Sequence, residues 1–106
     1  MSANPLSEWK EQFTFRASAE REFLALPEGI QRAFLRKFPL LARHPWRTTA
    51  ELDVAPLRDM PGRWRLKVEG GHRATYRDLQ GRPDFEMFES RDEIYERLQR
   101  YIGSRP

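Results

Sequence analysis

Basic and apolar side chains alternate within the stretch RWRLKVEGGHRATYR, residues 63–77. Arginine and lysine can bind phosphate oxygens and neutralise the charge that develops on phosphorus when a phosphodiester is attacked. If the attacking group is the 2′-hydroxyl of RNA itself, the reaction needs a base, an acid and cations, but no metal ion. The stretch contains no pair of carboxylates suited to sugar or peptide hydrolysis. The pattern therefore favours chemistry on a phosphodiester.

The length of the turn decides which face of this hairpin carries the cations. A two-residue turn at Gly70 and Gly71 would place Arg73 and Arg77 on the apolar face, and burying unpaired guanidinium groups is costly. A three-residue loop, 69–71, with a glycine in the left-handed conformation, places Lys67 opposite Arg73 instead. We therefore predict the three-residue loop. The apolar face then consists of Trp64, Leu66, Val68, Ala74 and Tyr76, and the polar face of Arg65, Lys67, Arg73, Thr75 and Arg77.

The polar face of this hairpin has two interpretations. Like charges held close together on a sheet repel each other, a cost that is tolerated where an anion binds. Charge patterning alone also fits a solvated outer face that is rich in arginine.

The segment before the hairpin predicts one strand and two helices. Residues 13–17, FTFRA, alternate like a short strand, and Ser18 can cap a helix that Pro27 stops. Pro27 also suits the first position of a second helix, which would pair with the first as an antiparallel hairpin. The second helix either ends near Lys37 or continues past Pro39 to Arg43. Its apolar face would be formed by Ile30, Phe34, Phe38 and Leu41.

The remaining segments predict a loop, a further strand and a last helix. Residues 44–61 contain three prolines and indicate a loop, and residues 79–83 indicate a turn. Asp84–Glu89 would form a strand with Phe85 and Met87 on one side and Phe88 on the other. Ser90 begins a capping box that opens a helix, whose apolar face would be formed by Ile94, Leu98, Tyr101 and Ile102.

These elements predict a single α+β domain over residues 1–106, in which residues 1–12 form a polar lead-in. The order is β-α-α-β-β-β-α, with helices packed on one face of a mostly antiparallel sheet. The cations would lie on the other face. One domain is what 106 residues allow.

Composition narrows the functional classes. The net charge is +3, and residues 1–77 carry 14 basic and 9 acidic side chains, whereas residues 78–106 carry 5 and 7. This bias favours a polyanionic partner such as nucleic acid. The chain has no cysteine, and His44 and His72 lack ligand spacing, so we expect neither a metal site nor another cofactor. The chain has no apolar run long enough to cross a membrane and no signal-peptide core, so we expect a cytoplasmic protein.

Three motifs in their order resemble the RelE/ParE superfamily of type II toxins. They are LRDMPGRWRLKV (Leu57–Val68), GHRATY (Gly71–Tyr76) and SRDEIY (Ser90–Tyr95). The resemblance extends from about Phe13 to Leu98, and it implies a RelE-like fold.

The resemblance also implies a function and a set of site residues. RelE-like toxins are ribosome-dependent mRNA endonucleases that are held inactive by an antitoxin from the same operon. It implies that Arg65 and Arg73 clamp the scissile phosphate and that Lys67 stabilises charge or aids proton transfer. Arg91 would assist the leaving group, and Tyr95 would be a base or a stacking partner. Besides these, we expect three residues to bind RNA: Arg63, His72 and Arg77.

Two other functions are open to a chain of this superfamily. A ParE-like toxin inhibits DNA gyrase without cleaving RNA, and a degenerate member only binds its antitoxin. Lys67 and Tyr95 favour the nuclease, whereas the acidic residues Glu89, Asp92 and Glu93 favour the gyrase inhibitor.

Overall fold

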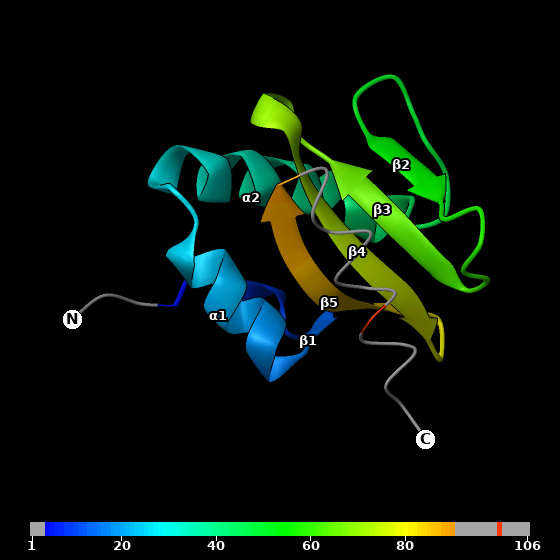
Figure 1. Cartoon of the computed structure of the whole chain (residues 1–106), viewed down its shortest axis with the longest axis horizontal. Helices are drawn as coiled ribbons and strands as arrows, with labels where there is room; N and C mark the ends of the chain where they lie inside the picture. Colours follow the sequence, from blue (N-terminus) through cyan, green and yellow to red (C-terminus); the bar gives the residue numbers. More distant parts are fainter. Residues whose placement is uncertain (1–3, 91–99, 101–106) are drawn as a thin grey trace.

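The computed structural model of this chain describes residues 4–90 and residue 100. Two helices lie against one face of a five-stranded mixed sheet (Figure 1). The elements are η1 (Ser7–Trp9), β1 (Thr14–Phe15), α1 (Ala17–Ala25), α2 (Glu28–Arg43), β2 (Asp53–Pro56), β3 (Arg63–Lys67), η2 (Glu69–Gly71), β4 (His72–Leu79) and β5 (Arg82–Ser90). The predicted α+β fold is confirmed, while the predicted C-terminal helix falls outside the described residues.

The strands follow the spatial order β1-β5-β4-β3-β2. β1 is parallel to β5, and the other neighbouring pairs are antiparallel. Both edges are short strands of two and four residues, which limits the unpaired backbone that the sheet exposes. None of the described helices is long and apolar enough to cross a membrane.

α1 begins two residues before the predicted position, and α2 begins one residue after it. α1 begins at Ala17 with Arg16, not Ser18, at its N-cap. The amide of Arg16 donates to the Phe85 carbonyl at 3.0 Å, so the β1–β5 pairing leads directly into the helix. Pro27 is the N-cap of α2 and not its first residue.

The second helix continues through Pro39 to Arg43, which settles the alternative that the sequence left open. Pro39 cannot donate the helical hydrogen bond to the carbonyl four residues earlier. Its own side chain is exposed, whereas Phe38 and Leu41 on either side are fully buried. Burial of these neighbouring turns offsets the lost hydrogen bond, because tertiary packing supplies most helical stability in proteins.

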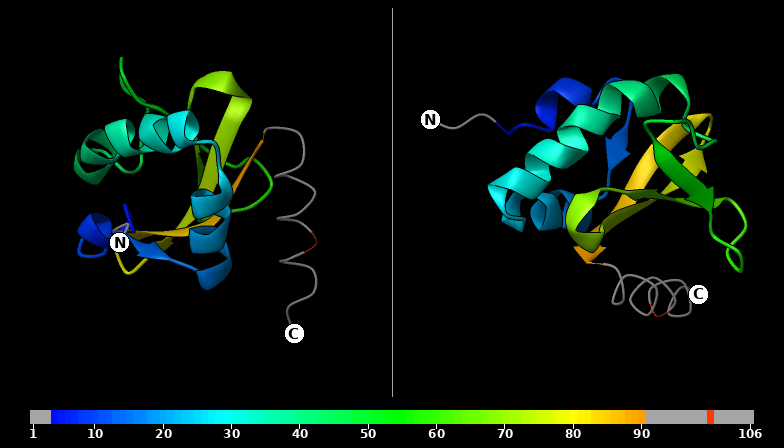
Figure 2. Two further views of the ribbon diagram at one scale, coloured as in Figure 1. Left: turned by 90° about the vertical axis from the view of Figure 1, so that its left-hand side faces the viewer. Right: turned by 90° about the horizontal axis from the view of Figure 1, so that it is seen from above.

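An aromatic core joins the helices to the sheet. Phe88 of β5 contacts Phe23 of α1 and Phe34 of α2, at ring-centroid distances of 5.2 and 5.1 Å. Phe85 contacts Phe13 and Phe38, both at 5.5 Å. The two helices therefore cover the same sheet face, as Figure 2 also shows.

A β-bulge in β5 overturns the predicted alternation of that strand. Thr75 pairs with Met87 and Tyr76 pairs with Phe85, so Glu86 is an extra residue on β5. A bulge reverses the side-chain alternation beyond it. Phe85 and Phe88 therefore both face the helices, whereas the prediction placed them on opposite sides.

Part of the predicted loop 44–61 is the edge strand β2. Asp53–Pro56 pairs antiparallel with β3, and Val54 is buried opposite Leu66. An edge strand has a neighbour on one side only, so it tolerates Pro56 at its end. The strand was not predicted because the prolines in this segment indicated a loop.

The register of the β3–β4 hairpin is the predicted one. Lys67 pairs with Arg73 and Leu66 with Ala74 across the three-residue loop Glu69–Gly71. Both glycines of that loop have φ of 76°, in the left-handed region. On the apolar face, Tyr76 is fully buried and donates a hydrogen bond from its hydroxyl to the Pro45 carbonyl at 2.6 Å. Burial raises the pKa of the Tyr76 hydroxyl.

Candidate functional site

The sheet face that points away from α1 and α2, called here the outer face, carries the predicted cations in cross-strand rows. In the first row Lys67 of β3 faces Arg73 of β4, and in the second Arg65 faces Thr75. In the third row Arg63 faces Arg77. The side chains of a row lie within about 5 Å of each other at Cβ. Five of the predicted site residues are therefore brought together by the hairpin.

Carboxylates from the neighbouring strands border these rows. In the strand register, Asp53 of β2 lies opposite Lys67 and Glu89 of β5 lies opposite Arg73. An acidic residue therefore stands at each end of the first row. In the third row Asp84 pairs with Arg77. These acids could not be placed beside the cations from the sequence alone, because they come from separate strands.

The third row is neutralised by ion pairs. The Arg63 guanidinium binds the buried Glu86 carboxylate through two contacts of 3.1 and 3.2 Å. Arg77 Nε lies 2.9 Å from Asp84 Oδ2, and the Thr14 hydroxyl donates to the other Asp84 oxygen at 2.7 Å. Both arginines, predicted to bind RNA, are thus committed to carboxylates, and their contact with RNA stays a prediction.

Arg65 in the second row is held more loosely. Its Nη1 lies 3.0 Å from Asp53 Oδ1, which is itself half exposed. An exposed ion pair of this kind contributes little free energy in water, so an incoming phosphate can compete for the guanidinium.

The first row contains the cations that are least neutralised. Neither Lys67 nor Arg73 has an ion pair with any side chain of residues 4–90. Arg73 Nε is also buried without a hydrogen-bond partner among the described residues. Two like charges that face each other on adjacent strands destabilise a sheet. The Lys67–Arg73 row is therefore the part of the outer face best suited to bind an anion.

His72 does not share the face of these cations. It precedes Arg73 on β4, so its side chain points to the opposite side of the strand. Its Nδ1 is buried and unpartnered among the described residues, in the space beside Gly70 and Ile30. Its predicted contact with RNA is untested. Arg91 and Tyr95, the other predicted catalytic residues, fall outside the described part of the chain.

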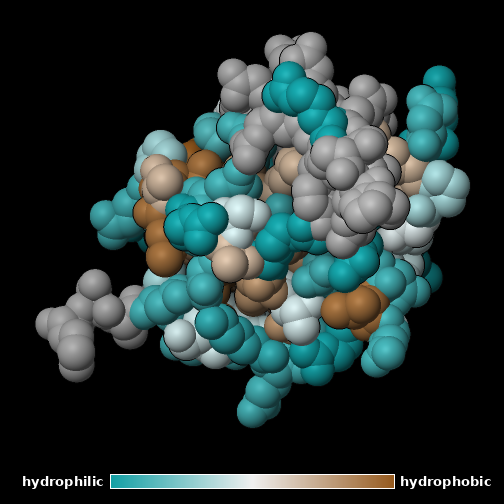
Figure 3. All heavy atoms as spheres, turned by 60° about the horizontal axis from the view of Figure 1, so that its bottom comes forward, coloured by the Kyte–Doolittle hydropathy of each residue, from teal (hydrophilic) through white to brown (hydrophobic). Residues whose placement is uncertain are grey.

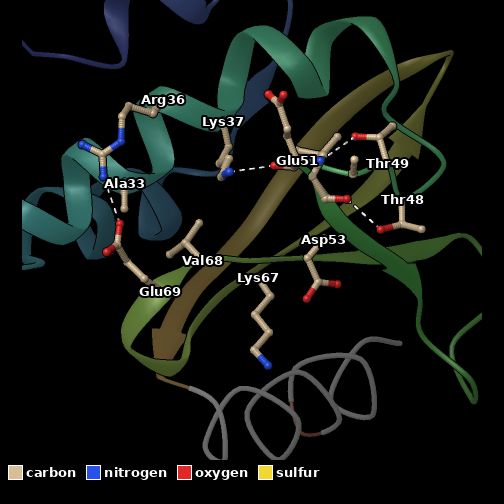
Figure 4. Close-up of a pocket in the computed structure, with 12 residues that line it drawn as sticks. Ala33, Arg36, Lys37, Thr48, Thr49, Glu51, Asp53, Lys67, Val68 and Glu69 are labelled. Carbon is tan, nitrogen blue, oxygen red and sulfur yellow. Dashed lines mark hydrogen bonds and ion pairs between the residues drawn. The ribbon is translucent and has the colours of Figure 1, made fainter.

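An open cleft of about 600 Å³ adjoins the first row, between α2 and the segment that leads into β2. Figure 4 shows Lys67 and Asp53 pointing away from α2, while Arg36 and Lys37 project from the helix on the other side. Lys37 donates to the Glu51 carbonyl at 2.6 Å, and Arg36 pairs with Glu69 at 2.9 Å. The sequence offered no signal for this cleft beyond basic residues on the exposed side of the helix.

The described residues on the face seen in Figure 3 are mostly polar. Figure 3 shows hydrophilic side chains over most of the visible face, with hydrophobic residues in separate areas. Among the described residues, the large hydrophobic side chains that are exposed are Leu24 and Leu79. In the same part of the chain, no group of three His, Cys, Asp or Glu side chains could hold a metal ion.

The α+β domain described above is similar in fold to solved RelE toxins. Comparison with solved structures shows that the chain has this fold. A free RelE toxin from Escherichia coli, a double arginine-to-alanine mutant, matches with a TM-score of 0.66 and 19% identity over 85% of this chain and 95% of that chain.

Two toxin–antitoxin complexes match as well. The toxin–antitoxin complex of RelB and RelE from Methanococcus jannaschii gives a TM-score of 0.65 at 14% identity, covering 80% of this chain and 98% of that chain. A RelBE complex from Mycobacterium tuberculosis gives 0.60 at 25% identity, covering 76% and 96%. No protein-family model matches the sequence, and no curated protein is significantly similar to it.

Proposed function

We propose that this chain is the toxin of a type II toxin–antitoxin system and cleaves mRNA on the ribosome, in the cytoplasm. The observation that carries the proposal is the Lys67–Arg73 row, where two cations face each other with no ion-pair partner among the described residues. The nuclease hypothesis is also supported by the RelE-like fold. This fold supports a toxin but does not by itself distinguish RNA cleavage from gyrase inhibition.

In this proposal the substrate supplies its own nucleophile. The 2′-hydroxyl attacks the adjacent phosphorus, the 5′-oxygen of the next nucleotide leaves, and a 2′,3′-cyclic phosphate forms. Arg73 and Lys67 stabilise the negative charge on the phosphate oxygens during attack. Arg65 clamps the phosphate after exchanging its contact with Asp53. Tyr95 and Arg91 are proposed for proton transfer and leaving-group assistance, as the family resemblance implies.

The proposed inhibitor is an antitoxin whose acidic segment folds over the basic surface. Related solved structures are complexes of RelE-type toxins with their antitoxins, which supports such a partner. A segment that folds on binding can cover a large area and neutralise several cations at once.

The test is primer extension on cellular transcripts after brief induction of this chain without an antitoxin. We expect new 5′ ends within translated codons, which disappear with Arg73→Ala. The matched control is Arg82→Ala, because Arg82 is an exposed arginine at the β4–β5 turn, opposite Leu79 and six residues along β4 from Arg73. This variant should cleave like the parent.

The alternative functions give different results in the same experiment. Growth arrest with intact transcripts would reject the nuclease and favour a ParE-like inhibitor, to be examined by a gyrase supercoiling assay. Normal growth at full expression would instead indicate a degenerate toxin that only binds its antitoxin.

A further inference from the structure

Thr75 occupies the one uncharged corner of a group of four neighbouring side chains on the outer face. Lys67 faces Arg73 in one row, and Arg65 faces Thr75 in the next. Facing side chains on adjacent strands lie about 5 Å apart at Cβ, and side chains two residues apart along a strand share a face. The four side chains therefore surround one small area of the sheet.

The Thr75 hydroxyl has no hydrogen-bond partner among the described residues, although Thr75 is only 1% exposed. Buried polar groups are nearly always paired, so an unpaired hydroxyl calls for a reason. The side chains beside it offer no good acceptor for its proton. Arg65 and Arg73 carry only donors, and Met87, which pairs with Thr75 from β5, has a weakly accepting thioether.

Arg73 Nε, in the next row, also needs a hydrogen-bond acceptor. It is also buried, and it too lacks an acceptor among residues 4–90. Two donors, a hydroxyl and a guanidinium N–H, are thus held on one strand beside two further cations. A phosphate group supplies several strong acceptor oxygens together with the negative charge that such a cluster requires.

We propose that the Thr75 hydroxyl is a further phosphate ligand, donating a hydrogen bond to an oxygen of the phosphate that Lys67 and Arg73 bind. The anion site stands on the geometry alone, and its assignment to the scissile phosphate of RNA rests on the proposed function. Lys67 and Arg65 have long, flexible side chains, so they can move aside and close over an incoming phosphate.

The experiment measures the melting temperature of the full chain in inorganic phosphate and in chloride at equal ionic strength. A ligand that binds only the folded state raises the melting temperature with its concentration. Parent, Thr75→Val and Thr75→Ser are compared. Valine keeps the shape of threonine and removes the hydroxyl, whereas serine keeps the hydroxyl and removes the methyl group.

We expect phosphate to stabilise the parent and Thr75→Ser alike, and Thr75→Val to bind phosphate about 10-fold more weakly, because hydrogen bonds to charged groups are strong. In chloride, Thr75→Val should melt at the same temperature as the parent or a few degrees higher, since the variant no longer buries an unpaired hydroxyl. A merely structural hydroxyl would give a lower melting temperature instead.

Four results would overturn the inference: a lower melting temperature of Thr75→Val than of the parent in chloride, equal phosphate affinity of Thr75→Val and parent, equal loss in Thr75→Ser, or no phosphate effect on the parent. The outcome is separable from that of the nuclease proposal. Thr75-dependent phosphate binding with intact transcripts in cells would keep this inference and reject the nuclease. Cleaved transcripts with phosphate binding that does not depend on Thr75 would do the reverse.

Discussion

Arg63 on β3 reaches across β4 to the Glu86 carboxylate on β5, with Nε and Nη2 lying 3.1 and 3.2 Å from the two oxygens. Arg16, at the N-cap of α1, approaches the same carboxylate at 3.4 Å. Glu86 is the extra residue of the bulge, and its side chain is completely buried. The bulge thus places a buried acid where it ties the central hairpin to the β1–α1 junction.

This arrangement predicts that Glu86→Gln destabilises the protein by about 3 kcal/mol, because removing one member of a buried ion pair leaves the other charge uncompensated. Chemical denaturation of the variant and the parent measures the difference. Glu28→Gln is the matched control, since Glu28 pairs with Arg32 on the exposed surface of α2. That variant should change stability by no more than about 0.5 kcal/mol. Equal losses in both variants would contradict the role assigned to Glu86.

Lys67→Met should separate function from stability. Removing one of two facing like charges relieves repulsion, so the variant should be more stable by roughly 0.5 kcal/mol at low salt. The gain should shrink as salt screens the remaining charges. Cleavage of transcripts should fall at least about 100-fold, because a group that stabilises developing charge is lost. A stable variant that cleaves like the parent would remove Lys67 from the site.

The hairpin was predictable because two registers differ greatly in energy. The alternative turn would have buried Arg73 and Arg77, so the local pattern alone selected the register that the structure has. Phe34 and Phe38 were equally clear as core residues of α2, since four-residue spacing places them on one helix face.

The elements that depend on distant partners were not predictable in this way. β2 is a strand because β3 supplies its hydrogen bonds, and the bulge at Glu86 exists only in the pairing of β5 with β4. The site also has one part that was predictable from local sequence and one part that was not. Its cations lie in one stretch of sequence, whereas the acids that neutralise them, Asp53, Asp84 and Glu86, come from other strands and become their neighbours only through sheet register.

Asp53 restrains Arg65, and its removal should strengthen RNA binding. Asp53→Asn removes the negative charge that holds the guanidinium at 3.0 Å and makes the net charge of the outer face more positive by one. We expect tighter binding of a single-stranded RNA oligonucleotide, with a salt dependence steeper by about 0.7 in log–log slope, equivalent to one more phosphate contact. Asp59→Asn changes the charge equally in an exposed loop position and is the control. The same gain in both variants would mean that net charge, and not Arg65, is responsible.

The buried hydroxyl of Tyr76 makes stability depend on pH in the alkaline range. Its pKa is raised by burial, so the folded protein holds the proton more tightly than the unfolded chain, whose tyrosine pKa is about 10. The hydroxyl therefore stabilises the fold fully below about pH 10, and this contribution is lost as the pH rises further. Parent should exceed Tyr76→Phe by about 1 kcal/mol at neutral pH, for the hydrogen bond to Pro45. Denaturation at several pH values should show this advantage disappearing above about pH 10, and a constant difference would contradict the assignment.

In the β4–β5 turn, Gln80 has a strained backbone conformation that a substitution can relieve. Gln80 and Gly81 both have positive φ, 55° and 88°, which is the backbone of a two-residue turn that prefers Asn-Gly. Gln80→Asn should therefore stabilise the protein by up to about 0.5 kcal/mol, and Gly81→Ala should destabilise it by about 1 kcal/mol, because a Cβ disfavours the left-handed region. Gly29→Ala is the opposing control: its Cβ would meet nothing within 4 Å, its φ is ordinary, and alanine favours the helix. Thermal unfolding should thus move in opposite directions for the two glycine variants, and a loss in both would show that the conformation of Gly81 is not the cause.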